Sequence, residues 1–301
     1  MVNFAQDMTS GAPVVVCEIG CNHRGDLNTA LEMIKIAAQF CNVDAVKFQK
    51  RNNRELLTEE EYSGPHPNPQ HSYGDSYGAH REFLEFDLSQ HCALKTACDE
   101  AGVIYSSSVW DLTSAKEIAS LEPSFIKVPS AINTDLRVLN YLFTEYRGDI
   151  HISLGMTTNK ERERVIELAD KQGRTKSIVL YHCISGYPVE INDLYLCEIQ
   201  ELKKNYQHRV KAIGFSGHHK GIAADVAALA LGAEYFERHF TLDRTWKGTD
   251  HAASLEPDGM RRLTRDLKAA KSALKSKPKE VLDVEEVQRA KLKRFYDTQS
   301  S

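Results

Sequence analysis

The sequence lacks several features that would place the protein in a membrane or outside the cell. No apolar run approaches the roughly 20 residues that a membrane-spanning helix needs. The N-terminal residues MVNFAQDMTSGAP show no basic start followed by a long apolar stretch, so no secretory signal is expected and the predicted location is the cytoplasm. The seven cysteines are an odd number and include no C-x-x-C pair, which argues against a disulfide framework or a zinc knuckle.

A net positive charge is found only at one end of the chain. The formal net charge is −4, yet residues 261–301 hold 12 Lys and Arg against 6 Asp and Glu, so residues 1–260 carry a net −10. Such an acidic body, without a basic patch interleaved with aromatics, does not predict nucleic-acid binding. We interpret the basic tail as a solvated helical face rather than a binding site.

Hydrophobic residues make up 42% of the 301 positions, which is typical of a globular chain. Short runs rich in Val, Ile, Phe and Tyr alternate with stretches of helical periodicity, and helix starts are expected after Asp26, Asp111 and Thr158. Eight such repeats predict an α/β fold, a single-domain (β/α)8 TIM barrel. A doubly wound open sheet is the rival, but its G-x-G-x-x-G turn is absent after the first run. The predicted strands are 14–19, 45–48, 103–106, 125–128, 150–153, 178–181, 211–215 and 234–238.

The repeats also predict the domain boundaries. The barrel is expected over residues 13–275, after an N-terminal lead at 1–12 and before a basic tail at 276–301. Residues 50–87, rich in Pro, Gly, His and Tyr, form a long connection after the second strand. A connection of that length is expected to be a functional lid or a disordered insertion.

Ionisable residues lie within or just after the predicted strands, where the active site of a barrel is found. Lys47 and Lys127 each stand between large apolar neighbours, so strand alternation points them into the barrel mouth, although outward lysines reaching solvent are the alternative. Two inward lysines beside serines such as Ser130 predict a pocket for a small, multiply charged anion.

Two histidines end neighbouring strands near the C-terminal half of the barrel. His218 and His239 can approach one divalent ion and leave positions open for substrate oxygens, but taken alone this signal is weak, because histidines are commonly hydrogen-bonded structural residues. Glu237, two residues before His239 on the same face, is a candidate ligand, orienting group or general base. Asp250, in the KGTDH turn, is a further oxygen ligand or an ordinary turn aspartate. His219 is expected to point away from this site.

Six segments together resemble the sialic acid synthase family, the phosphoenolpyruvate-dependent nonulosonate synthases. They cover about residues 13 to 275, and the last is long and specific. They read CEIGCNHRGDLNTALEMI, DAVKFQ, FIKVPSAI, HCISGYP, IGFSGHHKGIA and ERHFTLDRTWKGTDHAASLEP.

The resemblance implies a transferase that joins phosphoenolpyruvate (PEP) to the open-chain aldehyde of an N-acetylmannosamine-like sugar, giving a nonulosonic acid and phosphate. It implies a divalent metal, Mn²⁺ or Mg²⁺, with His218 and His239 as ligands. The residues around the reacting atoms would be Glu18, Gln49, Glu237 and Asp250. The PEP pocket would be formed by Lys47, Ser107, Lys127, Ser130, Ser185, Tyr187 and Ser216.

The chain departs from the family pattern at three places. Gly217 stands where many bacterial members have Asp, and Ile184 replaces a usual Thr. Typical members also continue into a C-terminal antifreeze-like domain, which is absent from these 301 residues. A homodimer in which the tail packs across the interface is expected in its place.

The residues alone also allow other functions. The acceptor can be a different aldose, phosphorylated or not. A Schiff-base aldolase would use Lys127 or Lys47 as its nucleophile. A non-catalytic barrel that binds a sugar acid is the third possibility, although the full set of glutamates, lysines and histidines argues against lost catalysis.

Overall fold

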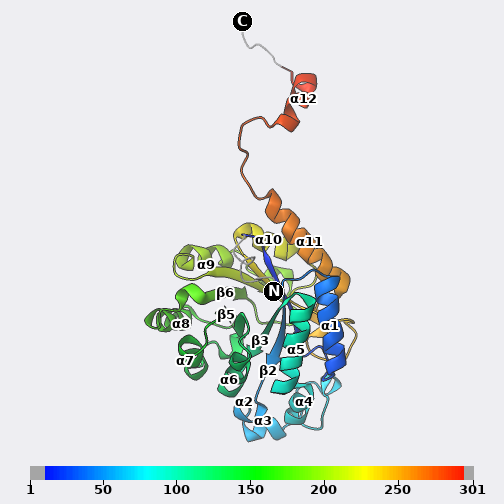
Figure 1. The fold of residues 1–301 in the computed structure, drawn as a ribbon, viewed down its shortest axis with the longest axis vertical. Helices are drawn as coiled ribbons and strands as arrows, with labels where there is room; N and C mark the ends of the chain where they lie inside the picture. The colour runs from blue at the N-terminus through cyan, green and yellow to red at the C-terminus, as the bar shows by residue number, and fades with distance from the viewer. Residues whose placement is uncertain (1–10, 295–301) are drawn as a thin grey trace.

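Eight apolar segments pair side by side in chain order, and the last pairs with the first to close a parallel barrel (Figure 1). The computed structural model describes residues 11–294. The predicted lead at 1–12 and tail at 276–301 therefore lie partly outside the described residues. The strands are β1 Val14–Gly20, β2 Ala45–Lys50, β3 Ile104–Val109, β4 Phe125–Val128, β5 Asp149–Ser153, β6 Ile178–Cys183, β7 Ala212–Gly217 and β8 Tyr235–His239.

A ring of helices covers the outside of the barrel, one after each strand (Figure 1). Asp26 and Asp111 accept backbone N–H bonds at the starts of α1 and α6, and Thr158 forms a capping box with Glu161 at α8. The helices of the ring are α1 Leu27–Gln39, α5 Leu88–Ala101, α6 Leu112–Ser120, α7 Leu136–Thr144, α8 Asn159–Lys171, α9 Glu198–Tyr206, α10 Ala223–Leu231 and α11 Pro257–Ala273. The predicted (β/α)8 barrel and the three helix starts are confirmed, and the open sheet is wrong.

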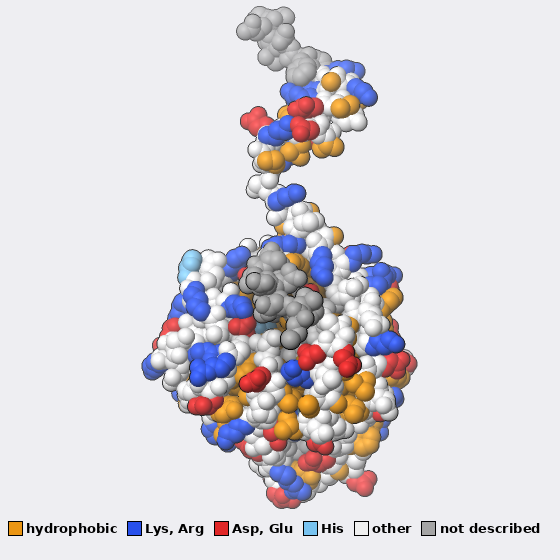
Figure 2. Space-filling view, viewed as in Figure 1, with side chains coloured by type: hydrophobic (Ala, Val, Ile, Leu, Met, Phe, Trp, Pro, Cys, Tyr) orange, Lys and Arg blue, Asp and Glu red, His pale blue; other side chains and the backbone are white. Residues whose placement is uncertain are grey.

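The long connection after β2 is ordered. It contains α2 Asn53–Leu56, α3 Glu59–Ser63 and α4 Tyr77–Leu84 before α5 begins. In contrast, α12 Asp283–Leu292 stands apart from the barrel beyond α11 (Figures 1 and 2). Its side chains Val284, Val287 and Leu292 are exposed. No helix within residues 11–294 is both long enough and apolar enough to cross a bilayer.

Two apolar clusters hold the barrel together. The larger fills the layer between the strands and the helix ring, and the smaller fills the lower interior of the barrel with residues such as Phe125, Tyr181 and Tyr235. Because the interior is plugged at that level, polar side chains can collect only above it, at the carboxyl ends of the strands. The site therefore lies where the strand pattern predicts.

His91, on α5, is a buried base in the outer layer. Its Nδ1 lies 2.8 Å from the Tyr105 hydroxyl, and burial lowers its pKa to about 3. Because the unfolded chain binds a proton at this histidine below about pH 6.5, while the folded chain does so only near pH 3, acid favours unfolding within that window.

We therefore expect His91→Gln to flatten the loss of stability on acidification. Between about pH 6.5 and pH 4, the free energy of unfolding of the variant should fall less steeply than that of the wild type, by about 1.4 kcal/mol per pH unit. Urea unfolding at several pH values measures both slopes. The matched control is His208→Gln, at an exposed position after α9. Equal slopes in the wild type and His91→Gln would contradict the expectation.

Candidate active site

One cavity of about 660 Å³ opens at the carboxyl ends of the strands. Its walls come from all eight strands or the loops that follow them, and from the segment 50–87. The predicted site residues that line it are Glu18, Lys47, Gln49, Lys127, Ser130, Ser185, Tyr187, Ser216, His218, Glu237, His239 and Asp250. Residues far apart in the chain thus meet at one place because the barrel is closed.

Two buried lysines and two buried glutamates occupy the floor of the cavity. Lys47 Nζ lies 2.6 Å from Glu18 Oε2 and 3.8 Å from Glu237 Oε1. Lys127 Nζ lies 2.9 Å from Glu237 Oε2 and 3.6 Å above the centre of the Tyr181 ring. The prediction that both lysines point inward is confirmed. Water screens these charges little, so each carboxylate depends on a lysine and each lysine on a carboxylate.

The two glutamates differ in proton affinity. Burial raises the pKa of Glu18, and Lys47 opposes that change. Burial also acts to raise the pKa of Glu237, but Lys127 and Lys47 outweigh it, so its pKa lies below the ordinary value. Glu237 is therefore the fixed counter-charge of the lysines, and Glu18 is the carboxyl group better suited to accept a proton.

A group of small polar side chains lies beside the lysines. The Gly155 amide donates to Ser130 Oγ at 3.0 Å, and the buried Ser185 Oγ has no hydrogen-bond partner. A Cβ at Gly155 would lie 2.3 Å from Ser185 Oγ and 2.8 Å from Ser130 Oγ, so a larger residue there would displace both hydroxyl groups. These hydroxyl groups can donate to an anion held by the lysines.

Two neighbouring serines on β3 point to opposite faces of the barrel wall. Ser108 pairs with Gln49 across the sheet, lines the cavity and accepts a 2.6 Å hydrogen bond from Lys47 Nζ. Ser107 pairs with Phe48, and its hydroxyl donates to the Ser108 carbonyl. Successive side chains alternate, so the structure brings Ser108 into the cavity and not Ser107, which was the predicted residue.

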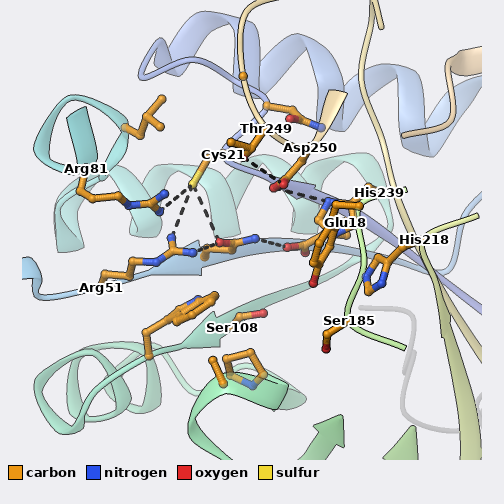
Figure 3. A pocket seen from close by; sticks show the side chains of 18 of the residues that line it. Glu18, Cys21, Arg51, Arg81, Ser108, Ser185, His218, His239, Thr249 and Asp250 are labelled. Atoms are coloured by element: carbon orange, nitrogen blue, oxygen red, sulfur yellow. Dashed lines mark hydrogen bonds and ion pairs between the residues drawn. The ribbon is translucent and has the colours of Figure 1, made fainter. Parts of the chain in front are cut away.

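The two histidines lie together at the mouth, with Asp250 beside them (Figure 3). Their ring centres are 5.4 Å apart, and Asp250 Oδ2 lies 3.8 Å from His239 Nδ1. His218 Nδ1 lies 3.0 Å from the Ile184 carbonyl, which accepts its proton and leaves Nε2 unprotonated. Burial lowers the pKa of His218 to about 3, so its ring is neutral at pH 7.

A fully buried network behind the barrel wall fixes these histidines. Arg238 precedes His239, and its guanidinium donates to Asp225 Oδ2 at 2.6 Å and to Gly221 O at 2.9 Å. His219 Nε2 lies 3.2 Å from the same carboxylate oxygen, which confirms that this ring points away from the cavity. The network joins the end of β7 to β8, and so sets the separation of His218 and His239.

A second group of polar residues, which sequence reasoning missed, lies at the opposite end of the cavity (Figure 3). Arg51 donates to Gln49 Oε1, and Gln49 Nε2 donates to Glu18 Oε1 at 2.8 Å. Because arginine has no acceptor, it fixes the amide of Gln49 with its NH2 group toward Glu18. Arg81, on α4, faces the same end. The position of Arg51 directly after β2 was the available signal, whereas the expectation of a lid over residues 50–87 did not specify which of its side chains would reach the cavity.

Comparison with known proteins identifies the family of the chain. A model described as the NeuB family matches residues 33–279 of the chain. The chain belongs to the NeuB family. Among curated NeuB relatives, the human N-acetylneuraminate-9-phosphate synthase is 35% identical, and the match covers 90% of this chain and 74% of the relative. The N,N'-diacetyllegionaminic acid synthase of Campylobacter jejuni is 32% identical over 87% of this chain and 77% of its own length.

Two solved structures have folds similar to that of this NeuB chain. An N-acetylneuraminic acid synthetase from Leptospira borgpetersenii serovar Hardjo-bovis, in complex with citrate, has a TM-score of 0.78 and 27% identity, and the match covers 94% of this chain and 93% of that one. A truncated 3-deoxy-D-arabino-heptulosonate 7-phosphate synthase from Thermotoga maritima has a TM-score of 0.66 at 15% identity and covers 88% of both chains. The second likeness shows a shared barrel only.

We expect Asp225→Asn to destabilise this NeuB protein strongly. The substitution keeps the shape of the side chain but leaves the buried Arg238 guanidinium without a counter-charge, at a cost of about 3–5 kcal/mol in the free energy of unfolding. Urea unfolding at pH 7 measures the change. Asp99→Asn, which removes an exposed partner of Lys95 on α5, is the matched control and should have little effect. Equal losses for the two variants would contradict this assignment of the network.

Proposed function

We propose that this protein joins PEP to the open-chain aldehyde of an N-acetylmannosamine-like sugar, forming a nonulosonic acid and phosphate. The observation that carries the proposal is the pair of buried lysines beside the serine hydroxyls, with two histidines and Asp250 across the same cavity. Its relatives are named as synthases of sialic-type acids, and these names support the same reaction class.

In this proposal the donor lies at the floor of the cavity. Lys47 and Lys127 would bind the phosphate and carboxylate groups of PEP, and the hydroxyls of Ser130, Ser185 and Ser216 would complete their hydrogen bonds. Tyr187, exposed at the rim, lies with its ring centre 4.2 Å from that of His218 and would border the donor on the histidine side. The donor is thereby oriented with its C3 carbon toward the mouth.

The chemistry then requires one carbon–carbon bond and one water. C3 of PEP bonds to the aldehyde carbon, positive charge develops at C2, and water adds there. One proton of this water ends on the former aldehyde oxygen, which becomes a hydroxyl group. The C2 carbon–oxygen bond to phosphate then breaks as the new C2 hydroxyl gives its proton to the departing phosphate, which leaves a 2-keto acid and inorganic phosphate. Glu18 would orient this water and accept its proton, because its pKa is raised, while Glu237 remains ionised against the lysines.

We further propose that His218 and His239 hold a divalent cation, Mn²⁺ or Mg²⁺. The residues fit such an ion: His218 is neutral, and His239 Nδ1 is buried without a hydrogen bond and faces Asp250. Within residues 11–294, no three His, Cys, Asp or Glu side chains converge to hold a metal by themselves, so substrate oxygens and water would supply the other ligands. When bound, the ion would polarise the aldehyde oxygen.

A second candidate is a Schiff-base aldolase. Burial lowers the pKa of Lys127, which is the property such a nucleophilic lysine needs, although Glu237 opposes the change. Borohydride trapping of a substrate adduct on Lys127 would favour this reaction. Full activity after borohydride treatment with substrate would exclude it.

We expect phosphate release only when PEP, an aldose and Mn²⁺ or Mg²⁺ are all present. A colorimetric phosphate assay over a panel of hexosamines and neutral aldoses measures this, since the site specifies the donor better than the acceptor. EDTA should abolish the release, and added Mn²⁺ should restore it. Activity that persists in EDTA would contradict the metal site, and release from PEP without any sugar would contradict the condensation.

We also expect Glu18→Gln to lower kcat by about 10²- to 10⁴-fold, because the variant cannot accept the proton of the attacking water. Its KM for PEP should change much less, since Lys47 and Lys127 remain. The control is Glu234→Gln, which makes the same substitution at an exposed position just before β8. A Glu18→Gln variant with wild-type kcat would rule out this role for Glu18.

A further inference from the structure

The ring of Tyr181, on β6, lies beneath Lys127 at the floor of the cavity. The tyrosine side chain is fully buried, and Lys127 Nζ lies 3.6 Å from the centre of its ring. That distance is reached only over the face of the ring, because the hydrogens along the edge keep an ammonium farther away. The face carries negative charge and attracts a cation, most strongly where water is excluded. The ring is therefore a partner of the ammonium and not only a packing surface.

Lys127 depends on this ring because it has few other partners. The Nζ atom of Lys47 has three polar partners, which are Glu18 at 2.6 Å, Ser108 at 2.6 Å and Glu237 at 3.8 Å. Among residues 11–294, Lys127 Nζ has one hydrogen-bond and ion-pair partner, which is Glu237 Oε2 at 2.9 Å. A lysine side chain is a flexible four-carbon stem, so one partner does not fix its end. The Tyr181 ring supplies the second point of attachment.

The ring is itself fixed by both neighbouring strands. On β5, His151 Nδ1 lies 2.9 Å from the Tyr181 hydroxyl, and the imidazole stacks on Phe125 with the ring centres 4.0 Å apart. Burial holds the pKa of His151 well below its ordinary value, so the imidazole adds no second cation beneath Lys127. On β7, Gly214 leaves the space that the ring fills, because a Cβ there would lie 2.7 Å from two ring carbons of Tyr181.

Packing alone would require only a large apolar side chain at this level of the barrel. Phe125 and Tyr235, in the same interior cluster, fill space in that way. Packing would not require that the face of one ring be turned to the only buried ammonium with a single polar partner on the floor of the cavity, within the part of the chain that the structure describes. The arrangement is explained if the ring directs Lys127.

We propose that Tyr181 is a positioning residue for the donor substrate, whose ring face holds the Lys127 ammonium in place to bind an anionic group of PEP. An ammonium has three N–H groups, of which Glu237 accepts one and the ring face attracts a second. The third is thereby directed to the ligand in the cavity. The proposal rests on the proposed binding of PEP by the lysines, and it adds a residue that acts through Lys127 from below.

The test changes the charge on the ring face without changing the shape of the ring. Stop-codon suppression places phenylalanine, a monofluorinated phenylalanine or a trifluorinated phenylalanine at position 181, and fluorine progressively removes the negative charge of the face. Titration calorimetry measures the dissociation constant for PEP, and the phosphate-release assay measures KM for PEP and for the aldose.

Tyr181→Phe keeps the face and should bind PEP within about 3-fold of the wild type. Relative to this variant, the trifluorinated ring should weaken PEP binding by about 5- to 10-fold, with the monofluorinated ring between the two. KM for the aldose should stay nearly constant. The loss of the hydroxyl bond to His151 is common to all three variants, so a difference among them reports on the face alone.

The matched control is the same series at Tyr235, a buried ring of the same cluster whose centre lies 6.5 Å from that of Tyr181. It should leave the affinity for PEP unchanged. Equal affinities across the series at position 181, or tighter binding by the trifluorinated ring, would overturn the positioning role and leave the proposed condensation standing.

If the wild type binds no PEP, the proposed function fails, and crystal structures of the variants then decide the role of Tyr181. The role requires Lys127 Nζ to stay above the ring in Tyr181→Phe and to be displaced in the trifluorinated variant. An ammonium in the same place in both crystals would overturn it.

Discussion

The chain of ion pairs among Glu18, Lys47, Glu237 and Lys127 is the constraint on which the site depends. These side chains come from β1, β2, β8 and β4, so their charges are compensated only if the barrel is closed in the correct register. A slip of one residue in any of these strands would turn a charge into the apolar layer beneath the helices, where no partner exists for it. Closure of the barrel and formation of an anion pocket are therefore one event.

The same closure explains why the cavity has distinct regions. The lower interior is filled by aromatic and apolar side chains, so substrates are confined to the space above them. Within that space, the lysines and serines lie at the floor, the histidines at one side and the arginines at the other. Arg238 and Asp225 act from behind the wall, where they take no part in binding but hold the ends of β7 and β8 in place.

Much of the fold could be predicted from the sequence because the strand pattern is local. Alternation within VKF and IKV was enough to point Lys47 and Lys127 inward. The same rule is sensitive to register, and the choice between Ser107 and Ser108 depended on how β3 pairs with β2, which no local pattern reveals. Arg81 could not be found in this way, because it reaches the cavity through the path of a long connection rather than through a strand. The metal and the homodimer remain predictions.

The long connection after β2 also meets the loop after β8. The Tyr73 hydroxyl donates to the Lys247 carbonyl, and the Gly248 amide donates to His71 Nδ1 at 3.3 Å. Since β1 lies between β2 and β8 in the barrel, these contacts fasten the rim above β1. The rim above β1 is thus closed by contacts between two loops, whereas Met156 and Tyr187, after β5 and β6 on the opposite arc, present their side chains to solvent.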